Sequence, residues 1–393
     1  MKKTIRDFDL NNKKVIIRYD FNVPIKEGKI IDDNRIKESL ATINYALENG
    51  AKLILLSHLG RIKEETDKEK NSLAPVAIRL SELLNKEVKF SHVTHGEELE
   101  NLVNNLQSGE VLLMENTRYE DVPGKKESGN DPELGAYWAS LGEIFINDAF
   151  GTAHRAHASN VGIASHLPSG LGFLVEKEVN ALEVLKDNNH PFVVILGGSK
   201  VQDKIGVIEN LVTKADKIMI GGGMAYTFLK AKGINIGKSI LDEENIDFCK
   251  KILEKYSDKI VLPVDNVVTE EYSNAVPYRT IPVDQINENE MGLDIGEETV
   301  KLFSETLENA KMVFWNGPLG VYEFSNFTKG TEKLLEKLVN INAITILGGG
   351  DIVAAASKLG YKDKVSHAST GGGVTLEFME GKELPGVVSI QDK

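Results

Sequence analysis

The chain has 393 residues, of which 41% are hydrophobic and 27% are charged, and its net charge is −13. This length accommodates two domains with separate cores, and the composition excludes a disordered chain. The acidic balance disfavours binding to nucleic acid or to an anionic membrane, because such a surface repels both. An anionic ligand would therefore need a positive site confined to one part of the surface.

The sequence predicts neither export nor a membrane span. No apolar run approaches the roughly 18 residues that cross a membrane. After Met1-Lys2-Lys3, charged residues from Arg6 to Asp9 interrupt what would be the apolar part of a signal peptide. The single cysteine, Cys249, excludes an internal disulfide and fits a reducing cytosol, so we expect a cytoplasmic protein. Cys249 lies in a helical pattern over 244–256, where a buried structural thiol is expected.

Short apolar runs alternate with amphipathic stretches along the whole chain. The runs are rich in leucine and β-branched residues, which is typical of buried strands. They lie at 15–18, 52–56, 111–114, 144–146, 192–196, 217–220, 259–262, 311–315, 343–347 and 365–367. Continuously apolar strands separated by helices predict parallel sheets that are covered on both faces. The expected fold class is α/β, with two doubly wound, Rossmann-like domains.

Two of the intervening stretches have a clear helical pattern. Over 35–48, four apolar residues from Ile36 to Leu47 fall on one helical face, and Gly50 suits the end of that helix. A second helix is expected over 171–186, ended by the segment 188–191. It is a candidate for the connection between the two domains, although the same pattern suits any packed helix.

Polar and basic clusters follow the predicted strands of the first half. Ligands of doubly wound sheets bind beyond the carboxyl ends of the strands, so these clusters are candidate site residues. They are Asp20-Phe21-Asn22, Ser57-His58-Leu59-Gly60-Arg61, Glu115–Arg118 and Asn147–Gly151 with His154-Arg155. Guanidinium groups donate paired hydrogen bonds to phosphate and carboxylate. The arginines of one such loop alone would be interpreted as solvated surface charge. Several such loops on one edge of a sheet predict an anion site.

Glycines follow the predicted strands of the second half. The loops are Gly197-Gly198-Ser199-Lys200, Gly221–Gly223, Gly348–Asp351 and Ser369–Gly373. Glycine lets backbone N–H groups approach a phosphate closely, and a helix N-terminus adds favourable partial charge. Four such loops predict a polyphosphate ligand, most simply a nucleotide, and Asp351 could hold its magnesium ion. Turn glycines without any ligand are the alternative for each loop taken alone.

Three familiar motifs fail when their spacing is checked. Gly233–Ser239 resembles a P-loop but has three residues between its glycines where four are needed. No G-x-G-x-x-G opens a helix after a predicted strand, so the dinucleotide fingerprint is missing. The pairs His92/His95 and His154/His157 have metal-like spacing but lack the further ligands of a zinc site.

Taken in order, these residues resemble the phosphoglycerate kinase family over essentially the whole chain. The likeness rests on Arg18–Pro24, Ser57–Arg61, Asn147–Gly151, His154–Ser159, Gly197–Val201 with Asp203–Ile205, Trp315–Glu323 and the two C-terminal triple-glycine loops. So many ordered matches exclude coincidence. The resemblance implies a glycolytic kinase that catalyses ATP + 3-phosphoglycerate ⇌ ADP + 1,3-bisphosphoglycerate with magnesium.

The resemblance also implies a domain organisation. An N-domain of residues 1–170 plus 376–393 would bind phosphoglycerate, and a C-domain of residues 188–375 would bind the nucleotide. A helix over 171–187 would join them, a hinge would close them around the substrates, and the last helix would return to the N-domain. We expect a monomer that acts on small molecules.

The site residues follow from the same resemblance, position by position. The implied phosphoglycerate-binding residues are Asp20, Phe21, Asn22, Arg35, His58, Leu59, Gly60, Arg61, Arg118 and Arg155. For the nucleotide, the resemblance implies that Lys200 and Lys204 bind the phosphates, Gly292 the base and Glu323 the ribose. The other implied nucleotide-binding residues are Asn316, Gly349, Gly350, Asp351 and Ile352. Asp351 is also the implied magnesium ligand. The implied catalytic residues are Arg35, Lys200 and Gly373, the last at a helix N-terminus facing the moving phosphoryl group.

Four positions depart from the usual family pattern: Tyr19, Ile62, Ser199 and Ile352. Ile352 puts a side-chain contact to the phosphates in doubt, although its N–H remains available. Because a carboxylate attacks phosphorus without losing a proton, we assign no general base and interpret the histidines as binding or packing residues.

Two other functions fit parts of the sequence. A nicotinamide dehydrogenase would share the acidic, doubly wound fold, but the missing fingerprint argues against it. A two-lobed anion-binding protein would share the arginine cluster, but it would not need Lys200, Lys204 and Asp351.

Overall fold

The computed structural model describes residues 1–186 and 189–393, which form two compact units. The first unit comprises Met1–Asn180 and Glu383–Lys393, and the second comprises Ala181–Lys382. The boundary between them falls within helix α6 (Phe173–Glu183), which one 3₁₀ turn, Val184–Lys186, extends. The expected junction at 187 and 188 lies outside the described residues. The chain returns to the first unit after Lys382, whereas the return was expected at residue 376. The difference arises because α13 (Gly372–Met379) packs against α7 (Ile205–Leu211) of the second unit.

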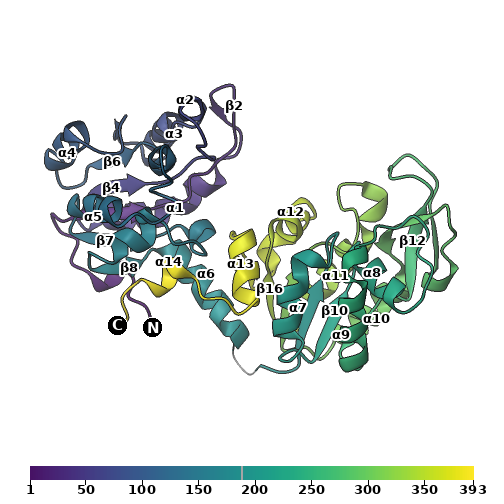
Figure 1. Cartoon of the computed structure of the whole chain (residues 1–393). Helices are drawn as coiled ribbons and strands as arrows, with labels where there is room; N and C mark the ends of the chain where they lie inside the picture. Colours follow the sequence, from purple (N-terminus) through teal and green to yellow (C-terminus); the bar gives the residue numbers. More distant parts are fainter. Residues whose placement is uncertain (187–188) are drawn as a thin grey trace. The chain divides into compact units, whose positions relative to one another are not determined.

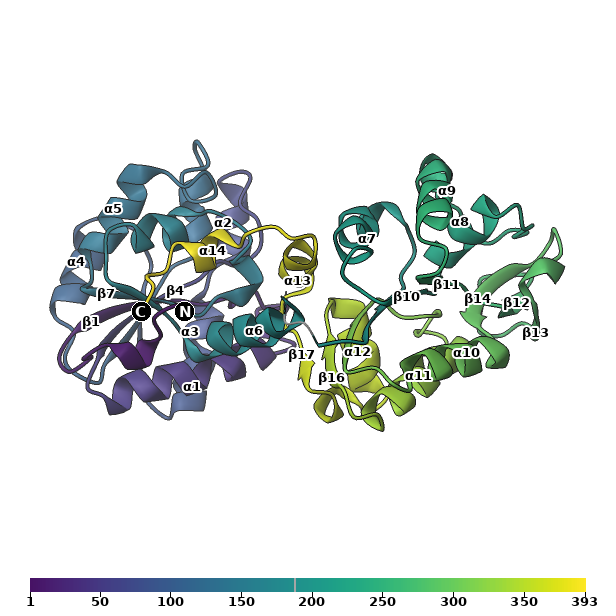
Figure 2. The same cartoon turned by 90° about the horizontal axis from the view of Figure 1, so that it is seen from below.

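The first unit is built on a six-stranded sheet in which every neighbouring pair is parallel. The spatial order of its strands is β5 (Val88–Ser91), β6 (Val111–Met114), β4 (Lys52–Leu56), β1 (Lys14–Arg18), β7 (Ile144–Asn147) and β8 (Ser169–Leu171). Its helices are α1 (Asn34–Glu48), α2 (Thr66–Lys70), α3 (Ala74–Leu84), α4 (Glu97–Asn104), α5 (Pro132–Ser140), most of α6, and α14 (Pro385–Val388), as Figures 1 and 2 show. A two-stranded hairpin, β2 (Ile25–Lys26) with β3 (Lys29–Ile30), precedes α1.

Helices cover both faces of this sheet, which explains why its strands are largely apolar. Val15 and Ile17 of β1 pack in one core with Ile36 of α1 and Val76 of α3. The intervening Ile16 points to the opposite face because successive side chains alternate along a strand, and it is buried as well.

The second unit contains another six-stranded parallel sheet, whose strands Figure 1 draws in colours from teal to yellow. Its order is β11 (Ile260–Val261), β10 (Lys217–Ile220), β9 (Phe192–Leu196), β15 (Met312–Asn316), β16 (Ile344–Leu347) and β17 (His367–Ala368). The helices are α7, α8 (Met224–Ala231), α9 (Ile246–Lys255), α10 (Glu297–Leu307), α11 (Lys329–Val339), α12 (Gly350–Lys358) and α13. A separate antiparallel sheet holds β13 (Arg279–Pro282), β12 (Asp265–Thr269) and β14 (Met291–Ile295).

The structure confirms the fold class and all ten predicted strands. It also confirms the helix after residue 34, whose chain turns at Gly50 with φ +75°, and the burial of Cys249 in α9. Residue 171 belongs to β8 and not to the helix that follows, which begins at Phe173. Over the described residues, we find no helix with the length and apolarity to cross a membrane.

Candidate functional site

The carboxyl ends of β6, β4, β1 and β7 lie side by side at one edge of the first unit's sheet. Their order brings the loops after Arg18, Leu56, Met114 and Asn147 together, although the sequence separates them widely. These are the loops that carry the predicted anion-binding residues. The first candidate site is therefore a surface built by four loops of one domain.

Asp20 and Arg35 form the closest ion pair at this edge. Asp20 Oδ2 lies 2.5 Å from Arg35 Nη1, and the Arg35 side chain remains 43% exposed. Gly151 lets the pair form, because a Cβ at this position would overlap the Asp20 carboxylate. The pair orients an otherwise flexible guanidinium group at the start of α1.

Four guanidinium groups gather around His58. Burial lowers the pKa of His58 well below its usual value, and the charges of Arg18, Arg118, Arg35 and Arg155 lower this pKa further. His58 is only 7% exposed. The imidazole is therefore uncharged at neutral pH, in the middle of a strongly positive cluster.

Arg118 lies near Arg61 and Arg155 as well as near His58. Burial lowers the pKa of Arg118, and the nearby charges of Arg155 and Arg61 act in the same direction. Its Nη1 lies 3.3 Å from Asp121 Oδ2, while its buried Nε has no hydrogen-bond partner among the described residues. Arg155 is exposed and donates from Nε to His154 Nε2 at 3.0 Å.

Asn116, which belongs to the predicted cluster Glu115–Arg118 but not to the implied phosphoglycerate-binding set, holds the loops of this edge together. Its Oδ1 accepts from the N–H groups of Leu59 at 3.2 Å and Arg118 at 3.0 Å. Its Nδ2 donates to the carbonyl groups of Leu59 at 2.7 Å and Asn71 at 2.8 Å. One buried amide thus uses all its hydrogen-bonding capacity to hold the loops of Arg61 and Arg118 in register.

The remaining residues of the predicted anion set have mixed environments. Asn22 is exposed, and its Oδ1 accepts from the N–H of Gly60 at 2.9 Å. Phe21 and Leu59 are buried in the core, and the N–H of Phe21 donates to Ser57 Oγ at 2.8 Å. Their side chains support the loops and do not face solvent.

Arg18 is a second residue that the predicted set omitted. It is fully buried at the end of β1, where Nε donates to Ser159 Oγ at 2.8 Å and Nη2 lies 4.0 Å from Glu127 Oε1. Ser159 also donates from Oγ to Glu127 at 2.5 Å. An arginine at the end of an otherwise apolar buried strand was the signal in the sequence, since such a charge needs buried partners.

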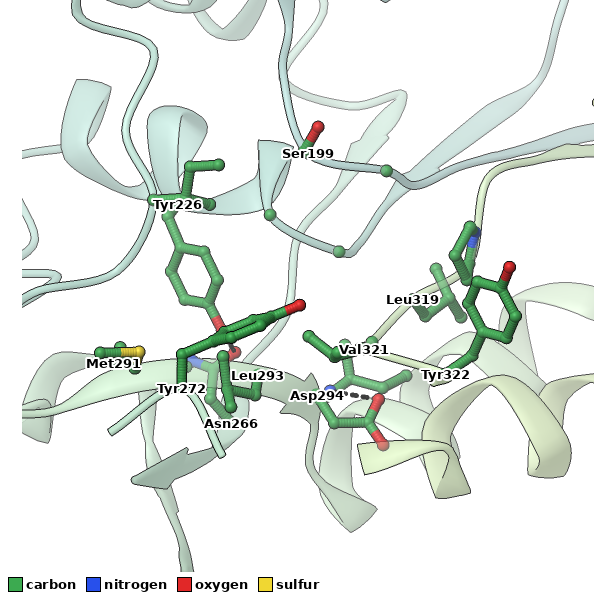
Figure 3. A pocket seen from close by; sticks show the side chains of 18 of the residues that line it. Ser199, Tyr226, Asn266, Tyr272, Met291, Leu293, Asp294, Leu319, Val321 and Tyr322 are labelled. Atoms are coloured by element: carbon green, nitrogen blue, oxygen red, sulfur yellow. Dashed lines mark hydrogen bonds between the residues drawn. The ribbon is translucent and has the colours of Figure 1, made fainter. Parts of the chain in front are cut away.

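The second unit holds a cavity of about 420 Å³. Figure 3 shows that the Tyr226 ring points from α8 toward Asn266, with Tyr272 and Leu293 beside it. Ser199, Tyr322 and Asp294 lie elsewhere on the lining of the same cavity. Its wall is apolar and aromatic, with a few polar groups, as is typical of a pocket for a flat ligand.

Gly292, Glu323 and Asp351 of the predicted nucleotide set line this cavity. Gly292 contacts Tyr226 so closely that a Cβ would overlap the Tyr226 hydroxyl. This hydroxyl donates to Asn266 Oδ1 at 3.2 Å, and the N–H of Gly292 donates to Ser239 Oγ at 2.9 Å. The backbone at Gly292 is therefore held as one wall of the cavity.

Asp294 is a buried carboxylic acid in the same wall. Burial raises its pKa from 3.8 to about 7, and the N–H groups of Gly330 and Ile295, which it accepts at 2.9 Å each, partly offset this effect. Asp294 is not among the predicted site residues. Its contacts show that it anchors the start of α11 to β14.

The glycine loops beside the cavity lie against one another. Gly197 has no room for a side chain, because a Cβ would overlap the carbonyl group of Pro318. Gly349 has φ +119° and directly precedes α12, whose first turn holds Gly350 and the exposed Asp351. A Cβ on Gly372 would lie 3.4 Å from the N–H nitrogen of Gly350, so the last two glycine loops are neighbours.

The two predicted lysines differ in exposure. Lys200 is exposed in the loop after β9, whereas Lys204 is largely buried. Burial lowers the pKa of Lys204, and the charges of Asp203, Asp351 and Glu380 oppose that shift. Lys204 and Asp351 are therefore within electrostatic range of each other.

Asn316, Ile352 and Gly373 complete the predicted set. Asn316 is buried and donates from Nδ2 to the carbonyl group of Gly348. The Ile352 side chain is fully buried in the core under the sheet, so only its backbone remains available to a ligand. Gly373 is exposed in the first turn of α13.

Asp351 fits the chemistry of a magnesium ligand. Mg²⁺ in nucleotide sites usually takes one or two protein carboxylates and completes its shell with phosphate oxygens and water. Asp351 is an exposed carboxylate that lines the cavity. Across residues 1–186 and 189–393, no three His, Cys, Asp or Glu side chains gather into a protein-only metal site.

The Gly233–Ser239 segment follows helix α8 rather than a strand, which agrees with its rejection as a P-loop. Its Gly237 has φ +55°, and a Cβ there would overlap the carbonyl groups of Asn287 and Glu290. Ser239 then supports Gly292 through the bond described above. The segment therefore supports one wall of the cavity and does not form a phosphate-binding P-loop.

Comparisons with known proteins agree with one another. The family model described as phosphoglycerate kinase matches residues 5–382. Curated proteins named phosphoglycerate kinase from Listeria innocua and Enterococcus faecalis are 61% and 60% identical to the chain, each over 100% of both sequences. The solved phosphoglycerate kinase of Coxiella burnetii matches with a TM-score of 0.91 and 39% identity, over 99% of this chain and 98% of that one. The one from Pyrococcus horikoshii matches with a TM-score of 0.84 and 33% identity, over 98% of each.

Proposed function

The chain belongs to the phosphoglycerate kinase family and transfers a phosphoryl group reversibly between ATP and 3-phosphoglycerate, and from this premise we propose which residues bind each substrate. The observation that carries the proposal is the different chemistry of the two units. Guanidinium groups gather at the sheet edge of the first, and glycine loops surround a largely apolar cavity in the second.

We propose that 3-phosphoglycerate binds at the guanidinium cluster. Arg61, Arg118 and Arg155 would hold its phosphate, because guanidinium groups bind such groups through paired hydrogen bonds. Asn22 and His58 would bind the carboxylate end, and Asp20 would hold Arg35 in place. Phe21, Leu59 and Gly60 would contribute through the loop backbone that they support.

The nucleotide would occupy the cavity of the second unit. Its base would lie against Gly292 and its ribose hydroxyl groups would bind Glu323. Lys200 and Lys204 would bind its phosphates, together with the backbone N–H groups of Gly349, Gly350 and Ile352, while Asn316 would hold the neighbouring loops.

Asp351 would bind the magnesium ion of the nucleotide, which neutralises phosphate charge when bound. The residues of this chain would then supply positioning and charge. Arg35 and Lys200 would stabilise the phosphoryl oxygens, and the α13 N-terminus at Gly373 would add N–H donors. No general base is needed, since the carboxylate nucleophile of 3-phosphoglycerate carries no proton.

The proposal includes a monomer that works in the cytoplasm. The lone, buried Cys249 fits a reducing compartment. Purified protein should behave as one chain in sedimentation at micromolar concentration.

Calorimetric titration tests the assignment of the two sites. Arg118→Ala should weaken 3-phosphoglycerate binding and leave ADP binding unchanged, whereas Glu323→Ala should do the reverse. An arginine variant that binds both ligands as the parent does would remove the basis of the phosphoglycerate site.

A further inference from the structure

The contact between Arg18 and His58 determines where the imidazole carries its proton. Arg18 Nη2 lies 3.3 Å from His58 Nδ1, and both residues are buried. A guanidinium group has only N–H donors and remains protonated in proteins. Nδ1 of His58 must therefore present its lone pair to Arg18.

The guanidinium of Arg18 is itself held by other buried groups. Its Nε donates to Ser159 Oγ at 2.8 Å and its Nη1 donates to the carbonyl group of Tyr19. Glu127 Oε1, 4.0 Å from Nη2, supplies the counter-charge. Arg18 thus cannot turn away from His58 without breaking bonds in the core.

The other charged groups around His58 do not offer Nδ1 a better partner. Asp20 Oδ1 is 4.0 Å from Nδ1, which is beyond hydrogen-bond length, and Asp20 Oδ2 is engaged by Arg35 at 2.5 Å. Arg35, Arg118 and Arg155 are positive and oppose protonation of the ring, as Arg18 does. The uncharged ring then carries its one proton on Nε2.

We propose that Arg18 holds His58 in the Nε2–H tautomer, so that an uncharged imidazole offers 3-phosphoglycerate a hydrogen-bond donor. The binding part rests on the function proposed above. Nε2 is separated from Nδ1 by one ring carbon, and its N–H bond points away from Arg18. Ionised carboxylate and phosphate oxygens only accept hydrogen bonds, so the opposite tautomer would set two acceptors against each other. Arg18 is in this sense a positioning residue.

Nitrogen-15 NMR of the full chain without ligand tests the tautomer directly. Two-bond proton–nitrogen correlations distinguish the two neutral tautomers and the imidazolium, and the signals of His58 are assigned by their loss in His58→Gln. We expect the Nε2–H pattern throughout the range in which an exposed histidine titrates, about pH 5 to 8. An Nδ1–H pattern or an imidazolium within this range would overturn the proposal.

A double variant tests the part played by Arg18. Arg18→Met with Glu127→Gln removes the donor together with its buried counter-charge, so no unpaired charge remains in the core. His58 should then sample both tautomers and protonate at higher pH than in the parent. An unchanged Nε2–H pattern in a folded double variant would show that Arg18 does not fix the tautomer.

Two substitutions of His58 test the binding part. The amide of His58→Gln places a donor near Nε2, whereas the amide of His58→Asn lies near Nδ1 and can satisfy only Arg18. We expect His58→Asn to lose about tenfold to a hundredfold in 3-phosphoglycerate affinity and His58→Gln to lose much less. ADP binding, unchanged in both, controls for folding. Equal losses of 3-phosphoglycerate affinity in the two variants would overturn the role of His58 as a donor. If the parent chain itself bound no 3-phosphoglycerate, the proposed binding site would be refuted, but the tautomer measured by NMR would still stand.

Discussion

The carboxylate of Asp20 and the guanidinium of Arg35 lie 2.5 Å apart, although one follows β1 and the other begins α1. This ion pair gives the long, partly exposed side chain of Arg35 one preferred direction. It does so at the edge of the sheet where the loops with the predicted anion-binding residues meet. In phosphoryl transfer, such positioned positive charge is the main contribution of the protein.

Replacing Arg35 by alanine should therefore reduce kcat by about a hundredfold or more, the typical loss when a transition-state donor is removed. Stability should change little, because the side chain is 43% exposed. Steady-state kinetics and the melting temperature measure the two effects. Lys37→Ala is the matched control, since Lys37 lies on the same helix but pairs with Asp33. Near-normal turnover of Arg35→Ala would refute its catalytic role.

Asp351→Asn should weaken the binding of Mg-ADP by at least about tenfold, the loss that removal of a residue supporting a metal ligand already causes. It should leave 3-phosphoglycerate binding unchanged. Calorimetry with and without magnesium checks this. In EDTA the variant and the parent should bind ADP equally, because only the metal contact has been lost. Asp363→Asn serves as control, since Asp363 is also exposed but is not part of the cavity lining. A loss of the same size in EDTA would contradict metal binding at Asp351.

Gly292→Ala should both destabilise the protein and weaken ADP binding. The new methyl group would overlap the Tyr226 hydroxyl, and overpacking a core typically costs about 1–3 kcal/mol. Thermal unfolding and ADP titration measure the two effects. Adding Tyr226→Leu should recover part of the stability, because it removes the overlapping ring. If Gly292→Ala alone kept the parent's melting temperature and affinity, the close packing described here would be wrong.

The Asp294 carboxyl should make the second unit less stable as pH rises. Its pKa is about 7 in the folded chain and near the ordinary 3.8 in the unfolded chain, so between these values the folded chain holds the extra proton. Stability therefore falls with rising pH over this window, by about 1 kcal/mol per pH unit. In Asp294→Asn this contribution should vanish.

Denaturant unfolding at pH 5 and pH 7 measures this difference. Asp284→Asn provides the control, because Asp284 is exposed in the same unit and should leave the pH dependence of the parent unchanged. If Asp294→Asn kept the parent's pH dependence, Asp294 would not be the linked group.

The sequence predicted ten of the twelve strands of the two parallel sheets, because those strands are largely apolar and buried on both faces. It missed β5, in which Lys89 and Ser91 interrupt the apolar residues. It did not reveal the antiparallel sheet, in which β13 has one buried residue, Ile281, after the exposed Arg279 and Thr280. Such a short, half-exposed strand has no strong pattern. Leu171, the last residue of β8, was assigned to the following helix, because the three residues of β8 are too few to reveal a period.

At the site, loop position predicted which arginines gather, because parallel strands end at one edge. The supporting network could not be read in the same way. Asn116 links Leu59, Asn71 and Arg118, and Arg18 reaches Ser159 over 141 positions of sequence. These contacts depend on tertiary packing. The burial of Ile352 shows the limit of transfer by motif, since the side chain at that position belongs to the core.

The first unit is completed by residues that are translated after the whole second unit. Glu383–Lys393 belong to it, and Asn147 Nδ2 donates to the carbonyl group of Gly386 at 2.7 Å. A ribosome must therefore finish the entire second unit before this piece of the first becomes available. The second unit is contiguous and can acquire all its contacts during synthesis. The first unit must wait with an unfilled surface beside β7 and the Ala158–Gly162 turn until these residues emerge. Surface that is exposed in this way during folding promotes aggregation.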